Sequence, residues 1–281
     1  MFDQITAFQG EEHKPFFWNG GAPAALLVHG FPGTPGEMLS LAEILHAQGW
    51  TVQGPLLPGF GADIGTLGTR SANDWVDAVG TALAELGRRH APVLLVGHSM
   101  GGAIAIQAAV RQPVDGLVLV SPFWKLKGGG PIRFLWPLIR RLIPQFKPFR
   151  LFKPDFDDLR TSEGIRQFLP DADLDDPAVR HAVRDFAVPT RLIDQVMATG
   201  ATSYAVAAGV HAPVLVIQGR EDEIVRPEYT RDLVERLGDS VQYHEIDGGH
   251  DLLEHDQVAW GAVTHLVLDF AQGIAHSPNH P

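Results

Sequence analysis

One serine lies in a sequence pattern typical of an activated nucleophile. Ser99 is flanked by Gly97 and Gly101, directly after the apolar run Val93–Val96 and before a helix-like stretch. A nucleophile at such a strand-to-helix turn has a strained backbone, and its neighbours two residues away must be small so that strand and helix can pass closely. The helix N-terminus also favours the negative charge that develops during acyl transfer. The pattern therefore predicts acyl-transfer chemistry at Ser99.

A serine hydroxyl needs a base at neutral pH, and imidazole has the most suitable unperturbed pKa. Among thirteen histidines, His250 lies in a glycine-rich loop after the last short apolar run, where a doubly wound sheet presents its catalytic loops. We expect His98, beside the nucleophile, to point away from it and to serve packing or the turn, and His29 is also next to a turn. His255 and His265 lie in the final helix pattern and are expected on its surface. His250 is the predicted base.

The imidazole in turn needs a carboxylate that fixes its tautomer and stabilises the imidazolium. Asp222 follows the apolar run Val214–Gln218 in a short loop, at the same predicted edge of the sheet as Ser99. Glu221 and Glu223 flank Asp222 and compete with it for this role. The predicted acid is therefore one of these three residues, and we favour Asp222.

An acyl-transfer site also needs two N–H donors for the oxyanion. One donor is expected from the residue after the nucleophile, Met100, and the other from a loop after an early strand. Phe31 occupies such a loop, between Gly30 and Gly33, whose glycines permit a tight backbone path. We predict that Met100 and Phe31 form the oxyanion hole.

Short apolar runs alternate with helix-like stretches along the chain, which is typical of a mostly parallel sheet with helices on both faces. The predicted strands are Ala24–Val28, Thr51–Gln53, Val93–Val96, Leu117–Val120, Val214–Gln218 and Val241–Ile246. The predicted helices are Glu37–Ala47, Ala72–Arg89, Met100–Arg111, Pro227–Leu237 and Glu254–Phe270. The sequence thus predicts an α/β protein whose loops bring Ser99, Asp222 and His250 to one edge of the sheet.

This alternation stops between Pro122 and about Tyr204, where helical patterns occur without a convincing strand. We therefore predict a core domain of residues 1–121 and 205–281, with residues 122–204 inserted as a helical cap. Aromatic side chains of the cap suggest an apolar acyl pocket, in particular Phe123, Trp124 and Trp136. An equal alternative is that they only attach the cap to the core.

One segment of the predicted cap, Pro131–Pro144, combines bulky apolar residues with arginines, as helices in a membrane interface do. The segment has a proline at each end and another inside it, which keeps any helix short, so we expect contact with lipid to be weak and reversible. The plainer alternative is that its apolar side chains face the core while Arg140 and Arg141 pair with the acidic second half of the cap.

The chain resembles the α/β-hydrolases, and its motifs look most like those of the carboxylesterase and monoacylglycerol lipase branch. The resemblance rests on the segments at residues 29–33, 97–102, 219–222 and 248–250. It covers the core, about residues 20–121 and 210–271, whereas the cap matches no known pattern. The resemblance implies a catalytic triad of Ser99, Asp222 and His250, with Phe31 and Met100 as oxyanion donors.

Composition argues against other classes of function. A formal net charge of −11 disfavours nucleic acid as a partner, because phosphate backbones are bound by clustered Lys and Arg. The absence of cysteine excludes disulfides and thiolate metal sites. The sequence also lacks the H-E-x-x-H motif, in which two histidines bind a catalytic metal, so we expect no cofactor. The N-terminus lacks the features of a signal peptide, and no apolar run is long enough to span a membrane. We expect a cytoplasmic protein, and its oligomeric state stays open.

These observations predict a serine hydrolase that cleaves small-molecule carboxylic esters with apolar acyl chains through an acyl-enzyme. C–C bond hydrolases and cofactor-free peroxidases share the triad, and they are the alternatives that the motifs leave open. Haloalkane dehalogenases and epoxide hydrolases of this fold resemble the chain less, because they carry Asp at the position of Ser99. A noncatalytic ligand-binding protein on the same fold would need no nucleophile, base and acid together.

Overall fold

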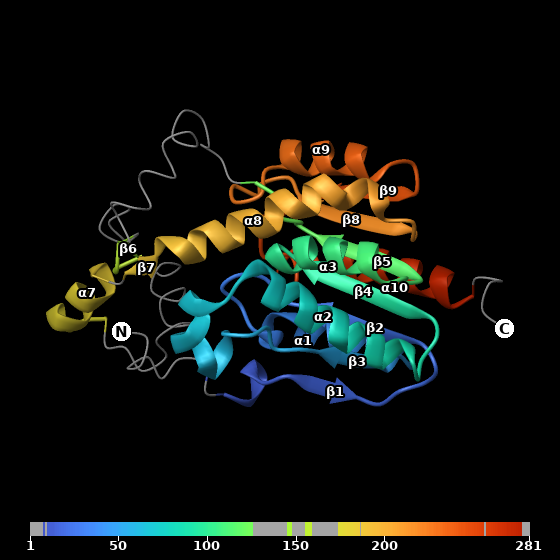
Figure 1. Cartoon of the computed structure of the whole chain (residues 1–281), viewed down its shortest axis with the longest axis horizontal. Coiled ribbons are helices and arrows are strands. Elements are labelled where there is room, and N and C mark those ends of the chain that lie inside the picture. The colour runs from blue at the N-terminus through green and yellow to red at the C-terminus, as the bar shows by residue number, and fades with distance from the viewer. Residues whose placement is uncertain are drawn as a thin grey trace.

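The fold is a central sheet between two layers of helices (Figure 1). The structure is a computed structural model that describes residue 8 and residues 10–125, 145–147, 155–158, 174–185, 187–255 and 257–276. Trp136, the third predicted pocket residue, and the segment Pro131–Pro144 lie outside the described residues.

The main sheet has seven strands in the order β1-β3-β2-β4-β5-β8-β9. The strands are β1 (Phe16–Trp18), β2 (Ala24–Val28), β3 (Thr51–Gly54), β4 (Val93–His98), β5 (Gly116–Val120), β8 (Val214–Gly219) and β9 (Val241–Ile246). All neighbours pair in parallel except β1 and β3. The six predicted strands are thus present, and the mostly parallel sheet is confirmed.

Helices cover both faces of this sheet, as predicted. Side chains of the central strands alternate between two apolar clusters, so that Leu95 packs into one cluster and Leu94 into the other. The first cluster includes residues of α2 (Ala72–Gly87), α3 (Met100–Arg111), α8 (Thr190–Val206) and α9 (Pro227–Leu237). The second includes residues of α1 (Leu39–Ala47) and α10 (Trp260–Ala275). Burial on both faces explains why the central strands β2, β4, β5 and β8 contain continuous apolar runs.

Several boundaries differ from the predictions. The helix expected from Glu37 begins as a 3₁₀ turn, η3 (Pro35–Met38), because the Thr34 side chain accepts the Gly36 N–H ahead of α1. The last helix begins at Trp260 rather than Glu254, so His255 precedes the helix instead of lying on it. β1 was not predicted, since three residues at an antiparallel edge are too short to show a period.

The predicted cap region contains a small sheet that its sequence did not indicate. β6 (Gln145–Phe146) pairs antiparallel with β7 (Val188–Pro189), near α7 (Pro177–Arg184). From β7 the chain continues directly into α8, which packs along α3 (Figure 1). The proposed boundary between residues 204 and 205 falls within α8. Within the described ranges, no helix is both long and apolar enough to cross a membrane.

Candidate active site

Ser99 lies on the sharp turn between β4 and α3. Its φ of 52° and ψ of −117° place it in a region that favours glycine. The Ser99 N–H donates to the Val120 carbonyl of β5 at 2.9 Å, and the Phe123 N–H donates to the Ser99 carbonyl at 3.0 Å. Gly101, two residues later, allows the start of α3 to approach β2, because an added Cβ there would overlap the carbonyl oxygen of Val28. The surroundings therefore hold the Ser99 backbone in its strained conformation.

Two substitutions at Ser99 should reveal this strain. Ser99→Gly and Ser99→Ala both remove the hydroxyl, but only alanine keeps a Cβ at positive φ. We expect the glycine variant to have a free energy of unfolding about 1 kcal/mol above that of the alanine variant, even after the larger entropy of unfolded glycine. Urea denaturation of the two variants measures this difference. An alanine variant that equals or exceeds the glycine variant in stability would show that the turn is not strained.

The loops after β8 and β9 bring a carboxylate and an imidazole to Ser99. His250 Nε2 lies 3.0 Å from Ser99 Oγ, and His250 Nδ1 lies 2.8 Å from Asp222 Oδ2. In the neutral tautomer of His250 that carries its proton on Nδ1, Nδ1–H donates a hydrogen bond to the carboxylate and Nε2 accepts one from the Ser99 hydroxyl. The structure thus brings together the three residues that the sequence predicted as nucleophile, base and acid.

Burial and hydrogen bonds distinguish Asp222 from its two acidic neighbours. The Asp222 side chain is 0% exposed, whereas Glu221 and Glu223 are exposed. Asp222 Oδ1 accepts the N–H groups of Ile224 at 2.9 Å and Val225 at 2.8 Å. Burial alone would raise the pKa of Asp222, but the hydrogen bond and charge of His250, with these donors, hold the pKa below its ordinary value. Asp222 is therefore the ionised carboxylate that the imidazole faces.

The lowered pKa of Asp222 makes folding stability depend on pH. Such a carboxyl group contributes its full stability above its unfolded pKa of about 4, and the contribution is lost as the pH falls through the folded pKa. We therefore expect the free energy of unfolding to decrease more steeply below about pH 4 in the unmodified protein than in Asp222→Asn. Urea denaturation between about pH 6 and about pH 3 tests this expectation. Equal slopes for the two proteins would contradict it.

The loop after β2 passes close to the nucleophile. A Cβ added at Gly30 would lie 3.1 Å from Ser99 Cβ. His29 fixes this loop, because its Nδ1–H donates to the Gly30 carbonyl at 2.9 Å and its Nε2 accepts the Leu57 N–H at 3.1 Å. Burial lowers the pKa of His29, so its ring is neutral and structural.

The two predicted oxyanion donors belong to segments on either side of Ser99. Phe31 follows Gly30 in the β2 loop, and its ring packs edge-on against Phe60 at 5.9 Å. Met100 is the first residue of α3, and the first N–H groups of a helix have no acceptor within that helix. This placement is compatible with an oxyanion hole, and the assignment of both donors stays a prediction.

Two of the predicted pocket residues are described, and both contact protein groups. Phe123 is buried and its backbone holds the Ser99 turn. Trp124 stacks on Tyr204 with 4.1 Å between ring centroids, and its Nε1–H donates to the Tyr229 carbonyl at 2.6 Å. The Lys125 ammonium lies 4.0 Å from the centre of the Trp124 ring. The bond to Tyr229 attaches the start of the cap to α9 of the core, as the alternative for these aromatic residues predicts, whereas the stack on Tyr204 lies within the predicted cap.

Sequence reasoning missed Glu37, a residue of η3 close to the nucleophile. Its carboxylate accepts the Gly30 N–H and faces His98 Nδ1. No local signal could have identified it, because an acidic residue at the start of a helix is usually solvated. His98 itself packs against the His250 ring and does not contact the Ser99 hydroxyl in any recorded hydrogen bond among the described residues.

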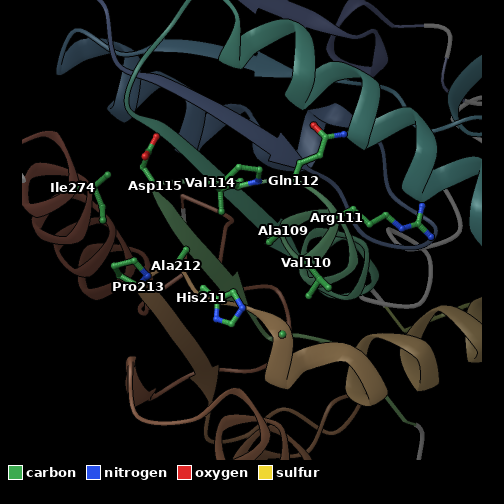
Figure 2. Close-up of a pocket in the computed structure, with 12 residues that line it drawn as sticks. Ala109, Val110, Arg111, Gln112, Val114, Asp115, His211, Ala212, Pro213 and Ile274 are labelled. Carbon is green, nitrogen blue, oxygen red and sulfur yellow. The ribbon is translucent and has the colours of Figure 1, made fainter. Parts of the chain in front are cut away.

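Figure 2 shows the lining of a surface pocket of about 470 Å³. Its position along the strands places it at the opposite end of the sheet from Ser99. Its lining comes from the end of α3, the segments that lead into β5 and β8, and α10, and it includes Arg111, Asp115, His211, Pro213 and Ile274. Asp115 and Pro213 directly precede the amino ends of β5 and β8, whereas the triad follows carboxyl ends. The pocket contains no member of the triad and is separate from the candidate active site.

Comparison with known proteins identifies the family of the chain. Residues 22–257 match a family model described as serine aminopeptidase, S33. A 122-residue segment is 34% identical to the thermostable monoacylglycerol lipase of Bacillus sp. (strain H-257) and covers 43% of this chain. That segment spans 48% of the length of the relative.

Solved structures share the fold across nearly the whole chain. A structure described with the metagenome-derived lipolytic enzymes LipS and LipT matches with a TM-score of 0.72 and 22% identity, covering 93% of this chain and 98% of the other. The monoacylglycerol lipase of Paleococcus ferrophilus matches with a TM-score of 0.67 and 23% identity, covering 94% and 100%. The meta-cleavage product hydrolase CumD of Pseudomonas fluorescens IP01 matches with a TM-score of 0.60 and 20% identity, covering 92% and 93%.

The fold, the order of strands and the family match therefore agree. The carboxyl ends of β4, β8 and β9 carry Ser99, Asp222 and His250 in the chain order expected for α/β-hydrolases. The chain belongs to the serine aminopeptidase S33 family of α/β-hydrolases.

Proposed function

We propose that this protein is a serine hydrolase that cleaves carboxylic esters through an acyl-enzyme. The observation that carries the proposal is the continuous hydrogen-bonded arrangement from Asp222 through His250 to Ser99, with Ser99 on a strained turn. Its similarity to a monoacylglycerol lipase supports an ester as the substrate.

The reaction begins when Ser99 Oγ attacks the ester carbonyl carbon and His250 Nε2 takes the serine proton. The Asp222 carboxylate stabilises the resulting imidazolium, and the N–H groups of Phe31 and Met100 bind the oxyanion. The imidazolium then protonates the leaving alcohol as the C–O bond breaks. Water, deprotonated by His250, attacks the acyl-enzyme, and the proton returns to Ser99 as the carboxylic acid leaves.

We further propose that the acyl group is apolar. Phe31, the predicted oxyanion donor, is partly exposed beside the β2 loop, and its apolar ring rests on the buried Phe60. An apolar lining of this kind suits an acyl chain better than a charged one. The contribution of the cap, including Trp136 and the weak lipid contact suggested by Pro131–Pro144, stays a prediction.

A substrate panel tests the proposal. It contains aryl and glyceryl esters of increasing acyl length, a vinylogous diketone for C–C bond hydrolysis, a halide oxidation assay with peroxide, and an aminoacyl anilide for peptidase activity. We expect turnover of the esters, with kcat/KM increasing from acetyl to longer acyl chains. Cleavage of the diketone or the anilide in preference to every ester would overturn the proposal. The similarity of CumD to this fold is the reason for including the diketone.

A further inference from the structure

The carboxylate of Glu37 and the imidazole of His98 form a pair next to the nucleophile. His98 precedes Ser99 and is 5% exposed, and its Nδ1 lies 3.4 Å from Glu37 Oε1. On the other side of its ring, His98 Nε2 lies 3.3 Å from the carbonyl oxygen of His250. The triad mechanism uses neither Glu37 nor the His98 side chain, so the pair requires an explanation of its own.

The partners of His98 identify its protonation state. Glu37 is a carboxylate and the backbone oxygen of His250 is a carbonyl, so both nitrogens of His98 face groups that only accept hydrogen bonds. An imidazole can donate from both nitrogens only as the imidazolium. The other titratable groups around His98 are Asp251, which follows the base, His29, whose ring is neutral, and His250, whose ring centroid lies 5.1 Å from that of His98.

The electrostatic balance agrees with this geometry. Burial alone would lower the pKa of His98, but the hydrogen bond and charge of Glu37 outweigh burial and raise the pKa above its ordinary value. Burial would likewise raise the pKa of Glu37, and His98 with the Gly30 N–H lowers it instead. Each partner is charged because the other is present.

Glu37 also reaches the other side of the site. The Gly30 N–H donates to the same Oε1 atom that faces His98, and a Cβ added at Gly33 would overlap the carboxylate. Gly30 directly precedes Phe31, the predicted oxyanion donor. One carboxylate thus connects the β2 loop to the residue before the nucleophile, and His98 extends the connection to the backbone of the base.

We infer that Glu37 and His98 act together as positioning residues, which hold the β2 loop, the Ser99 turn and the His250 loop in one fixed arrangement. The inference rests on the proposed function, because the arrangement matters for an oxyanion donor, a nucleophile and a base. It predicts that loss of either side chain reduces catalysis through misplacement of the three segments. Displacements of about 1 Å in an active site can lower rates about 100-fold.

The test compares Glu37→Gln, His98→Gln and the double variant with the unmodified protein. We expect each single variant to lower kcat for a short-chain aryl ester about 10- to 100-fold, with KM within about twofold, because substrate binding is retained while transition-state alignment is lost. Since the two residues act as one unit, the double variant should be no slower than the slower single variant. Melting temperatures and circular dichroism establish that the assayed variants are folded.

Matched controls are Glu43→Gln in α1 and His265→Gln in α10, both exposed residues away from the triad. These controls should retain the activity of the unmodified protein. Rates within about twofold of that protein in both single variants, or effects that multiply in the double variant, would overturn the inference. If Glu37→Gln does not fold, the kcat of His98→Gln alone tests the inference, since that variant keeps the Glu37 side chain.

A second measurement is independent of ester turnover. Long-range proton–nitrogen NMR spectra of the unmodified protein should show both His98 nitrogens protonated at about pH 7.5, where an ordinary histidine is neutral. In Glu37→Gln, burial is unopposed and His98 should carry one proton. A neutral His98 in the unmodified protein would overturn the inference even if esters are hydrolysed. Conversely, if no ester is hydrolysed while His98 is found as an imidazolium, the proposed function is overturned but the charged Glu37–His98 pair is still shown to exist.

Discussion

Ser99→Ala should be folded and should retain almost no esterase activity. Removal of the hydroxyl leaves His250 and Asp222 without a nucleophile to activate, and triad members act as one unit. We therefore expect turnover to fall about a million-fold, with the residual rate coming from binding and the oxyanion donors. Steady-state hydrolysis of an aryl ester measures the loss. Ser240→Ala, in an exposed turn before β9, is the matched control and should keep full activity.

A Ser99→Ala protein with more than about a hundredth of the original turnover would contradict the assignment of the nucleophile. The comparison requires highly purified protein, because a trace of an esterase from the expression host gives the same signal. A second preparation from a strain that lacks other esterases excludes that source.

Asp222→Asn should be the most impaired of the three acidic substitutions in the β8 loop. An amide cannot stabilise the imidazolium and can favour the wrong tautomer of His250, and the corresponding loss in a serine protease is about 10⁴-fold in kcat. Glu221→Gln and Glu223→Gln should retain most activity, because both side chains are exposed and neither makes a recorded contact with His250 among the described residues. Measurement of kcat for all three variants at one pH separates the candidates.

If Glu221→Gln or Glu223→Gln were the inactive variant, the acid would be misassigned and the loop would have to adopt another conformation in solution.

The sheet and the nucleophile were predictable from sequence for a local reason. Strands buried on both faces leave continuous apolar runs, and the close passage of α3 against β4 and β2 demands glycine at positions 97 and 101, respectively. His250 was identifiable because the loop after the last strand of an α/β sheet reaches the carboxyl edge. These features depend on residues that are near one another in the chain.

Other features depend on contacts that are distant in sequence. Spacing alone did not separate Asp222 from Glu221 and Glu223, and only the fold shows that Asp222 is buried against His250. Glu37 has no sequence signal, because its partner His98 lies 61 residues away in the chain and becomes a neighbour only when η3 packs against β2, next to β4. In the same way, the contacts of Trp124 with α8 and α9 link segments that are far apart along the chain.

The central claim is that Ser99 becomes covalently acylated during turnover, and one measurement tests it directly. The protein is mixed with an aryl ester, quenched in acid within the first turnover, and digested for mass spectrometry of its peptides. We expect the acyl mass on the peptide that contains Ser99, and a larger acylated fraction with esters whose acylation is faster than deacylation. Ester turnover without an acyl adduct on Ser99, or with the adduct on another residue, would contradict the account.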